Sequence, residues 1–92
     1  MTGSVVAVDL GATSGRVVLA TLTGGRLGLT EVHRFSTAAR QGDDGLRLDI
    51  AAILAEVQAG IGRAIEAAPG PVASVGIDCW AVDYGLLDPT GS

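Results

Sequence analysis

The sequence predicts an α/β fold in which a mixed sheet with an antiparallel hairpin packs against one main helix. Valine-rich apolar runs bounded by glycine-containing turns predict the strands, and a later stretch with helical spacing predicts the helix. A further apolar run after that helix predicts one more central strand. With 92 residues, the chain forms at most one small domain.

The first third of the chain predicts three consecutive strands. Ser4–Leu10 is a short valine-rich run that is typical of a strand buried on both faces. After the bend Gly11–Gly15, the run Arg16–Thr23 predicts a second strand. Gly24-Gly25 tolerates the positive φ of a primed hairpin turn, so the next run, Arg26–Ser36, should pair antiparallel with the second strand.

The third strand has two possible registers. Strict alternation places five side chains on one face, namely Leu27, Leu29, Glu31, His33 and Phe35. Val32 then falls on the other face, so a bulge near Thr30 is the alternative.

A polar loop and a helix follow. Thr37–Gly45 is small and polar and predicts an exposed loop, after which Leu46–Leu48 adds a short extended piece. From Asp49, which is predicted to be the N-cap, the apolar residues recur at helical spacing: Ile50, Ile53, Leu54, Val57, Ile61, Ala64, Ile65 and Ala68. Gly60 and Gly62 weaken a helix by about 1 kcal/mol each relative to alanine, or they permit close packing on the sheet.

The last quarter of the chain returns to extended structure. Pro69-Gly70-Pro71 ends the helix. Ala73–Asp78 predicts a buried strand, Ala81–Leu87 predicts an extended stretch, and Asp88–Gly91 predicts a turn.

Composition excludes several classes of function. The chain has 6 basic and 10 acidic residues, a net charge of −4, so it lacks the basic stripe of a nucleic-acid binder. All basic residues are arginine, and the absence of lysine excludes a P-loop, a protein-kinase site and Schiff-base chemistry. One cysteine and one histidine make neither a closed zinc site nor an intrachain disulfide. No export or membrane segment is evident, so we expect a cytoplasmic protein.

The bend after the first strand carries the strongest chemical signal. Small residues let the backbone approach a ligand, and the amides of a turn can form an anion-binding concavity. Thr13 and Ser14 add hydroxyl groups, and Arg16 adds a guanidinium suited to phosphate oxygens. Asp9, at the end of the strand, is placed to hold a hydrated Mg²⁺. The alternative is an ordinary hairpin in which Gly, Thr and Ser only satisfy turn geometry.

A second signal lies beyond the last predicted strand. Trp80 and Tyr84 could face a sugar ring while Asp78 or Asp83 binds its hydroxyls, at the strand end where open α/β sheets place ligands. In the alternative interpretation the aromatic side chains fill the core and the aspartates cap turns.

Three other polar features are expected to have structural rather than chemical roles. His33 is expected to be a strand residue without a chemical role, because no partner cluster surrounds it in sequence. Cys79 is expected to be a small buried hydrophobe, and Asp43-Asp44 is expected to be a solvated turn.

Taken together, three segments resemble one enzyme family. Ala7–Arg16 resembles the first phosphate loop of the FGGY carbohydrate kinases, which belong to the actin-like, ribonuclease-H-like ATPase superfamily. Glu31–Phe35 and Ser74–Asp88 are similar to the rhamnulokinase branch of that family, and the segments occur in the family's order. The resemblance implies a partial ribonuclease-H-like domain. Residues 1–92 would form the N-terminal portion of the first kinase domain, and the rest of that domain and the second domain would be absent.

The resemblance also implies site residues. ATP phosphates would contact the bend, at Gly11, Ala12, Thr13, Ser14, Gly15 and Arg16. Asp9 would contribute to the Mg²⁺ site through water, and the sugar would lie against Trp80, Ala81 and Asp83. Ala81 stands where the family pattern has glycine, and Cys79 stands where threonine is usual.

The implied reaction transfers the γ-phosphoryl group of ATP to the 1-hydroxyl of L-rhamnulose, with ATP and the sugar as partners and neither a nucleic acid nor a membrane involved. None of the aspartates here matches the family's catalytic base, so the sequence assigns no catalytic residue. We expect the 92-residue chain alone to be inactive and only marginally stable, with exposed sheet edges. The alternatives are another FGGY ketose kinase and a non-enzymatic small α/β domain.

Overall fold

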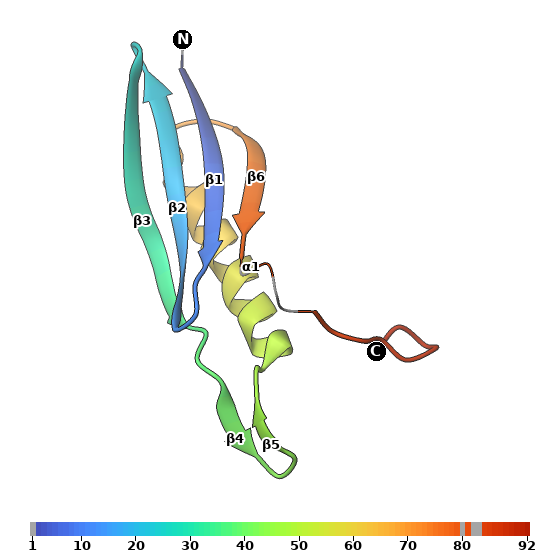
Figure 1. Ribbon diagram of the computed structural model, residues 1–92. Coiled ribbons are helices and arrows are strands. Elements are labelled where there is room, and N and C mark those ends of the chain that lie inside the picture. Colours follow the sequence, from blue (N-terminus) through green and yellow to red (C-terminus); the bar gives the residue numbers. More distant parts are fainter. Residues whose placement is uncertain (1, 80, 82–83) are drawn as a thin grey trace.

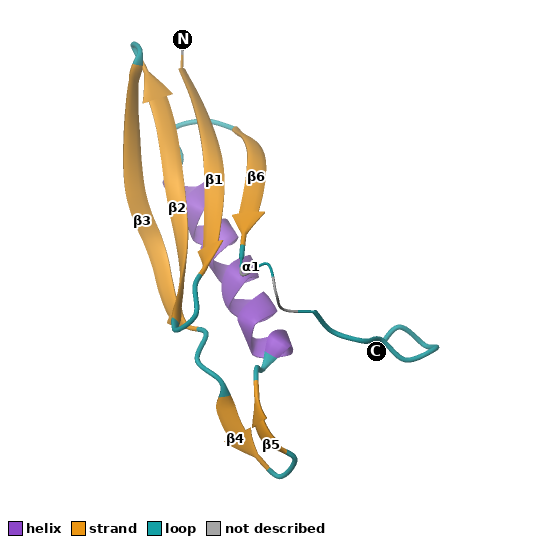
Figure 2. Cartoon of the chain, in the orientation of Figure 1, coloured by secondary structure: helices purple, strands orange, loops and turns teal. Residues whose placement is uncertain are grey.

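The chain folds as a sheet with one long helix against one of its faces (Figures 1 and 2). The computed structural model describes residues 2–79, 81 and 84–92. Its elements in chain order are β1 (Thr2–Leu10), β2 (Ser14–Thr23), β3 (Arg26–Ser36), β4 (Arg40–Gly42), β5 (Gly45–Arg47), α1 (Ile50–Ala67) and β6 (Val72–Asp78).

The main sheet is mixed. Its strand order is β3-β2-β1-β6, in which β1, β2 and β3 form an antiparallel meander and β6 runs parallel to β1. Parallel neighbours need a crossover connection, and α1 lies within it. The predicted mixed sheet, antiparallel hairpin and main helix are therefore confirmed. The short strands β4 and β5 form a separate hairpin that projects beyond the sheet (Figure 1).

The turn between β2 and β3 confirms the predicted primed geometry. Gly24 and Gly25 both have positive φ values, of 57° and 77°. Residues with a Cβ adopt this backbone region rarely, so the Gly-Gly pair is what allows the two strands to join by two residues.

β3 contains the bulge that strict alternation does not allow, at a slightly different position from the one predicted. Val17 pairs with His33 and Val18 pairs with Glu31, so Val32 is the extra residue. The bulge puts Glu31 and His33 on opposite faces of the sheet, with His33 facing α1. The bulge, at Val32, therefore lies two residues after the position near Thr30 that the sequence suggested.

The core forms on the helix side of the sheet. It consists of Val6, Val8, Val17, Leu19, Phe35, Val57 and Ala64. Along β1 the buried residues alternate with exposed ones, and Val5 is 39% exposed. The prediction that this strand is buried on both faces is therefore wrong, because α1 covers only one face.

The boundaries of α1 follow the predicted signals. The Asp49 carboxylate accepts a hydrogen bond from the Ala52 amide at 3.0 Å, as an N-cap does. The helix ends at Ala67, and the Ala68 amide still donates to the Ala64 carbonyl at 2.9 Å before Pro69. No helix among the described residues has the length and apolar character needed to span a membrane.

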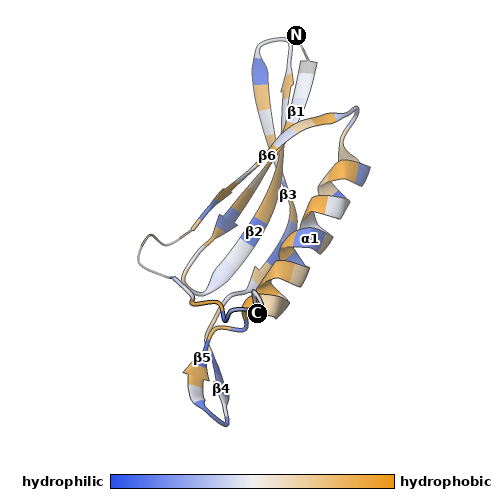
Figure 3. Cartoon of the chain, turned by 90° about the vertical axis from the view of Figure 1, so that its right-hand side faces the viewer, coloured by the Kyte–Doolittle hydropathy of each residue, from blue (hydrophilic) through white to orange (hydrophobic). Residues whose placement is uncertain are grey.

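The β6 side of the molecule leaves apolar residues exposed. Figure 3 shows the hydropathy of each residue along β6 and α1. All residues of Ala73–Asp78 are exposed, including Val75 at 44% and Ile77 at 59%. On α1, Leu54 and Ile65 are also more than half exposed. The predicted buried strand is therefore an exposed edge strand, because α1 packs mainly over β2 and β3. The exposed sheet edge agrees with the expectation from the sequence.

Candidate functional site

The bend Gly11–Thr13 joins β1 to β2 at the carboxyl end of β1. The Gly11 amide donates to the Ser14 carbonyl at 2.9 Å and closes the bend. Ser14 and Gly15, which the sequence placed in the bend, already belong to β2. Ala12 and Thr13 are exposed, so the tip of the bend faces solvent.

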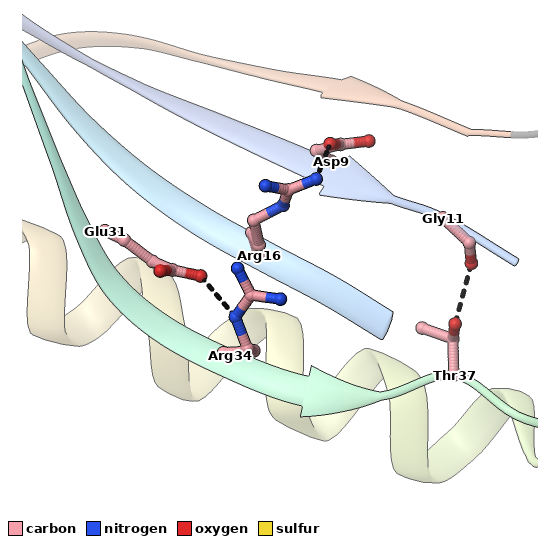
Figure 4. A network of polar contacts seen from close by, with 6 residues as sticks. All are labelled: Asp9, Gly11, Arg16, Glu31, Arg34 and Thr37. Carbon is pink, nitrogen blue, oxygen red and sulfur yellow. Dashed lines mark hydrogen bonds and ion pairs between the residues drawn. The ribbon is translucent and has the colours of Figure 1, made fainter. Parts of the chain in front are cut away.

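Thr37, which directly follows β3, forms two hydrogen bonds with this bend. The Thr37 hydroxyl donates to the Gly11 carbonyl at 2.7 Å (Figure 4). The Thr37 amide donates to the Thr13 carbonyl at 3.1 Å. Thr37 is only 5% exposed. Sequence reasoning placed it in an exposed loop and missed its role, because its partners lie 24 to 26 residues earlier in the chain.

The bend keeps hydrogen-bond donors available. Among the described residues, the backbone amides of Ala12 and Thr13 make no hydrogen bond. The Thr13 and Ser14 hydroxyls likewise make none to the part of the chain that the structure describes. An anion that approaches the tip would therefore meet unused donors, as in the backbone concavities that bind phosphate.

Gly15 has a packing role at the base of the bend. A Cβ at this position would lie 2.5 Å from Cζ of the Phe35 ring. Only glycine leaves room for the ring, which seals the core directly behind the bend. Gly11 is similarly restricted, because a Cβ there would lie 3.0 Å from the Ser14 carbonyl oxygen.

Asp9 and Arg16 flank the bend on the face of the sheet opposite α1 (Figure 4). They are register partners across β1 and β2, and Arg16 Nη2 lies 3.4 Å from Asp9 Oδ2. Both side chains are about half exposed: that of Arg16 is 46% exposed and that of Asp9 is 55% exposed. Such exposed ion pairs contribute about 0–1 kcal/mol at most, so either group can exchange its partner for a ligand at little cost.

Parallel pairing brings a second carboxylate to this end of the sheet. Asp78, at the end of β6, is the register partner of Asp9, at the end of β1. Open α/β sheets place ligands at the carboxyl ends of parallel strands. No cluster of three or more metal-ligating side chains occurs in residues 2–79, 81 and 84–92. Two carboxylates fit Mg²⁺, which keeps several waters and takes further oxygens from substrate phosphates.

The segment beyond β6 is described only in part. The predicted sugar residues Trp80 and Asp83 lie outside the described residues. Ala81 is exposed, and Tyr84 is 89% exposed, so Tyr84 does not fill the core. Cys79 is also exposed, which contradicts its expected burial: it directly follows the uncovered strand β6.

Asp88 confirms the predicted C-terminal turn. Its carboxylate accepts from the Thr90 hydroxyl at 2.6 Å and from the amides of Thr90 and Ser92 at 2.9 and 3.0 Å. These hydrogen bonds, led by the one from the Thr90 hydroxyl, lower the pKa of Asp88. This aspartate caps the turn that the sequence predicted over Asp88–Gly91.

His33 connects the sheet to the helix. Its Nδ1 accepts from Arg63 Nη1 at 3.0 Å, so Nε2 carries the proton and donates to Glu56 Oε2 at 2.8 Å. Both partners lie on α1, and the His33 side chain is only 11% exposed. These bonds align α1 across β3 and lie apart from the bend.

Neither of two hollows in the described part of the chain is lined by residues of the bend. A hollow of about 20 Å³ lies between the end of β3 and the start of α1 and is lined by Ser36, Ala38, Arg40, Asp49, Ala52, Ile53 and Glu56. This volume accommodates about one water molecule. The candidate site is therefore an exposed bend and strand end, not a closed pocket.

Comparison with known proteins identifies the sequence family. No family model matches the chain. A rhamnulokinase of Pectobacterium carotovorum is 46% identical over 90 residues, which cover 96% of this chain and 18% of that protein. Rhamnulokinases of Oceanobacillus iheyensis and Bacillus subtilis are 45% and 39% identical over 83 and 85 residues, 90% and 92% of this chain. The chain spans only 17–18% of the length of these relatives. Because the identity extends over nearly all of its residues, the chain belongs to the rhamnulokinase family.

Proposed function

We propose that the chain forms the first phosphate-binding hairpin and part of the sugar-facing wall of an ATP-dependent sugar kinase. In the full-length polypeptide, a kinase of the relatives' length that contains this chain, the γ-phosphoryl group of ATP is transferred to the 1-hydroxyl of L-rhamnulose. Residues 1–92 would then be the N-terminal portion of a first domain with the ribonuclease-H-like, actin-like fold. The antiparallel meander followed by a helix and a parallel strand supports this assignment.

The observation that carries the proposal is the exposed bend with unused donors. The unused donors are the amides of Ala12 and Thr13 and the hydroxyls of Thr13 and Ser14. The Arg16 guanidinium lies at the same end of the β1–β2 hairpin, in an ion pair with Asp9 (Figure 4). Phosphoryl transfer requires positioning and charge stabilisation more than covalent chemistry from the protein, and backbone donors with arginine supply both. The Gly11 amide is already bonded to Ser14 and shapes the bend instead.

Asp9 and Asp78 suit the metal that accompanies ATP. Mg²⁺, when bound, neutralises charge on the phosphate oxygens. Asp9 would hold its hydration shell from the end of β1, and Asp78 lies beside it in register. Arg16 limits the repulsion between Asp9 and incoming phosphates, because it is ion-paired with that carboxylate.

The sugar-facing side rests on the family resemblance. By that resemblance, Trp80, Ala81 and Asp83 would face the sugar. Ala81 adds one methyl group where the family pattern has glycine, which narrows the space for the ketose. The base that accepts the hydroxyl proton would come from outside these residues.

Substrate choice tests the proposed function. Full-length polypeptide is incubated with Mg·ATP and L-rhamnulose, L-fuculose, L-ribulose or no sugar, and ADP release is followed. We expect kcat/KM for L-rhamnulose to exceed that for the other ketoses by about 10-fold or more, since a pocket built for one hydroxyl pattern rejects others. The 92-residue chain alone should release no ADP. Preference for another ketose would assign a different kinase of the FGGY family, and no sugar-dependent release would contradict a kinase function.

A further inference from the structure

We propose that Thr37 is a positioning residue for the nucleotide, because its side chain and its amide hold both ends of the phosphate-binding bend. The proposal rests on the function proposed above, since it concerns the same bend. Thr37 itself touches no ligand in this proposal. It acts through the backbone of Gly11–Thr13.

Two hydrogen bonds from one residue define the position of the bend. The Thr37 hydroxyl donates to the Gly11 carbonyl at 2.7 Å (Figure 4). The Thr37 amide donates to the Thr13 carbonyl at 3.1 Å. The hydrogen bond from the Thr37 amide continues the ladder between β2 and β3, beyond the register pair Ser14 and Ser36. The hydrogen bond from the Thr37 hydroxyl is different, because it reaches past β2 to the end of β1.

The hydrogen bond from the Thr37 hydroxyl sets the direction of the Ala12 N–H, a backbone donor of the bend. In a planar trans peptide, the C=O of one residue and the N–H of the next point in opposite directions. Because the Gly11 carbonyl points at Thr37, the Ala12 N–H of the same peptide unit points away from Thr37. Ala12 is exposed and its amide makes no hydrogen bond among the described residues. Thr37 therefore turns this donor outward, to the side from which an anion approaches.

The backbone of the bend needs such a restraint. Glycine at position 11 gives this peptide unit more rotational freedom than any other residue would. The buried Thr37, 5% exposed, removes that freedom before a ligand arrives. A donor that is already oriented binds more tightly than one that must be ordered on binding, which is the general benefit of preorganisation.

Substitutions of Thr37 in the full-length polypeptide separate this role from general stability. Thr37→Val keeps the shape and removes the hydroxyl, whereas Thr37→Ser keeps the hydroxyl. We expect Thr37→Val to raise KM for Mg·ATP on the order of tenfold, the effect of losing one oriented hydrogen bond. KM for the sugar should not change, and Thr37→Ser should stay within about twofold of the unsubstituted protein. Ser36→Ala, which removes a neighbouring exposed hydroxyl, is the matched control and should change neither KM.

A second measurement reads the bend directly, without activity. Amide hydrogen exchange of Gly11, whose N–H is bonded to Ser14, should become faster in Thr37→Val and remain slow in Thr37→Ser. If the unsubstituted protein is an active kinase but Thr37→Val leaves KM for Mg·ATP unchanged, the positioning role is wrong. Equal increases in both KM values, with Thr37→Ser equally impaired, would also overturn it and indicate a purely structural residue. Failure of the proposed function looks different, because the unsubstituted protein would then show no sugar-dependent ADP release.

Discussion

Asp9→Asn in the full-length polypeptide is expected to lower kcat/KM for Mg·ATP by about 10- to 100-fold, the usual cost of losing a carboxylate that orients a metal site. Asparagine keeps the size of the side chain but carries no charge. The fold should tolerate the change, because Asp9 is exposed and its ion pair with Arg16 spans 3.4 Å. Activity of Asp9→Asn should also need more Mg²⁺ to reach half of its maximum, and a magnesium titration at fixed ATP measures this.

Arg16→Ala is a second test of the bend, and Arg26→Ala is the control for both substitutions. Arg16→Ala should weaken ATP binding by a similar factor, since a charge-assisted hydrogen bond contributes about 1.5–3 kcal/mol. Its requirement for Mg²⁺ should not change. Arg26→Ala removes the same charge at the opposite end of the hairpin, beside the Gly24-Gly25 turn, and should leave ATP binding unaffected. If Asp9→Asn and Arg16→Ala both bind Mg·ATP normally, the bend has no role in nucleotide binding.

The second large effect concerns the contact between α1 and the sheet, where two glycines of one helix should respond in opposite directions. A Cβ on Gly60 would collide with Cγ2 of Val17 and lie 3.2 Å from Cβ of His33. Val17 is fully buried and β-branched, so it cannot move aside. A Cβ on Gly62 meets nothing within 4 Å.

Gly60→Ala should therefore destabilise the fold, and Gly62→Ala should stabilise it. Overpacking costs about 1–3 kcal/mol and outweighs the gain of about 1 kcal/mol in helix propensity, a gain that Gly62→Ala obtains without a clash. For a domain of this size each kcal/mol shifts Tm by about 4–8 °C. Thermal unfolding followed by circular dichroism measures both variants. A higher Tm for Gly60→Ala would show that α1 does not approach β2 as closely as described.

Local patterns in the sequence predicted the strands of the main sheet and the helix, but they missed β4 (Arg40–Gly42), which lies in the predicted loop Thr37–Gly45. The bounds of β3 match the predicted run, and Asp49 caps α1 as expected, because turn glycines and N-caps act within a few residues. Burial was predicted less well. Valine-rich runs such as β1 and β6 show that a strand is apolar, but the position of α1 decides which face is covered. The sequence carries no local signal for that position.

The candidate site shows the same division between local and distant information. The bend and its small residues were evident from Asp9–Arg16 alone. The contacts of Thr37 with the bend and the pairing of Asp9 with Asp78 depend on strands that meet far apart in sequence. Those relations follow from the sheet order, which the residues of any one segment do not determine.

The most direct test of the bend as a phosphate site is amide hydrogen exchange of the full-length polypeptide with and without saturating Mg·ATP. Exchange over Gly11–Arg16 should slow when the nucleotide binds, because the free amides of Ala12 and Thr13 gain acceptors. The other exposed glycine turn of the hairpin strands, Gly24-Gly25, should exchange at an unchanged rate and serves as the internal control. Unchanged exchange over Gly11–Arg16 in a polypeptide that has demonstrably bound Mg·ATP would contradict the assignment of this bend to the phosphates.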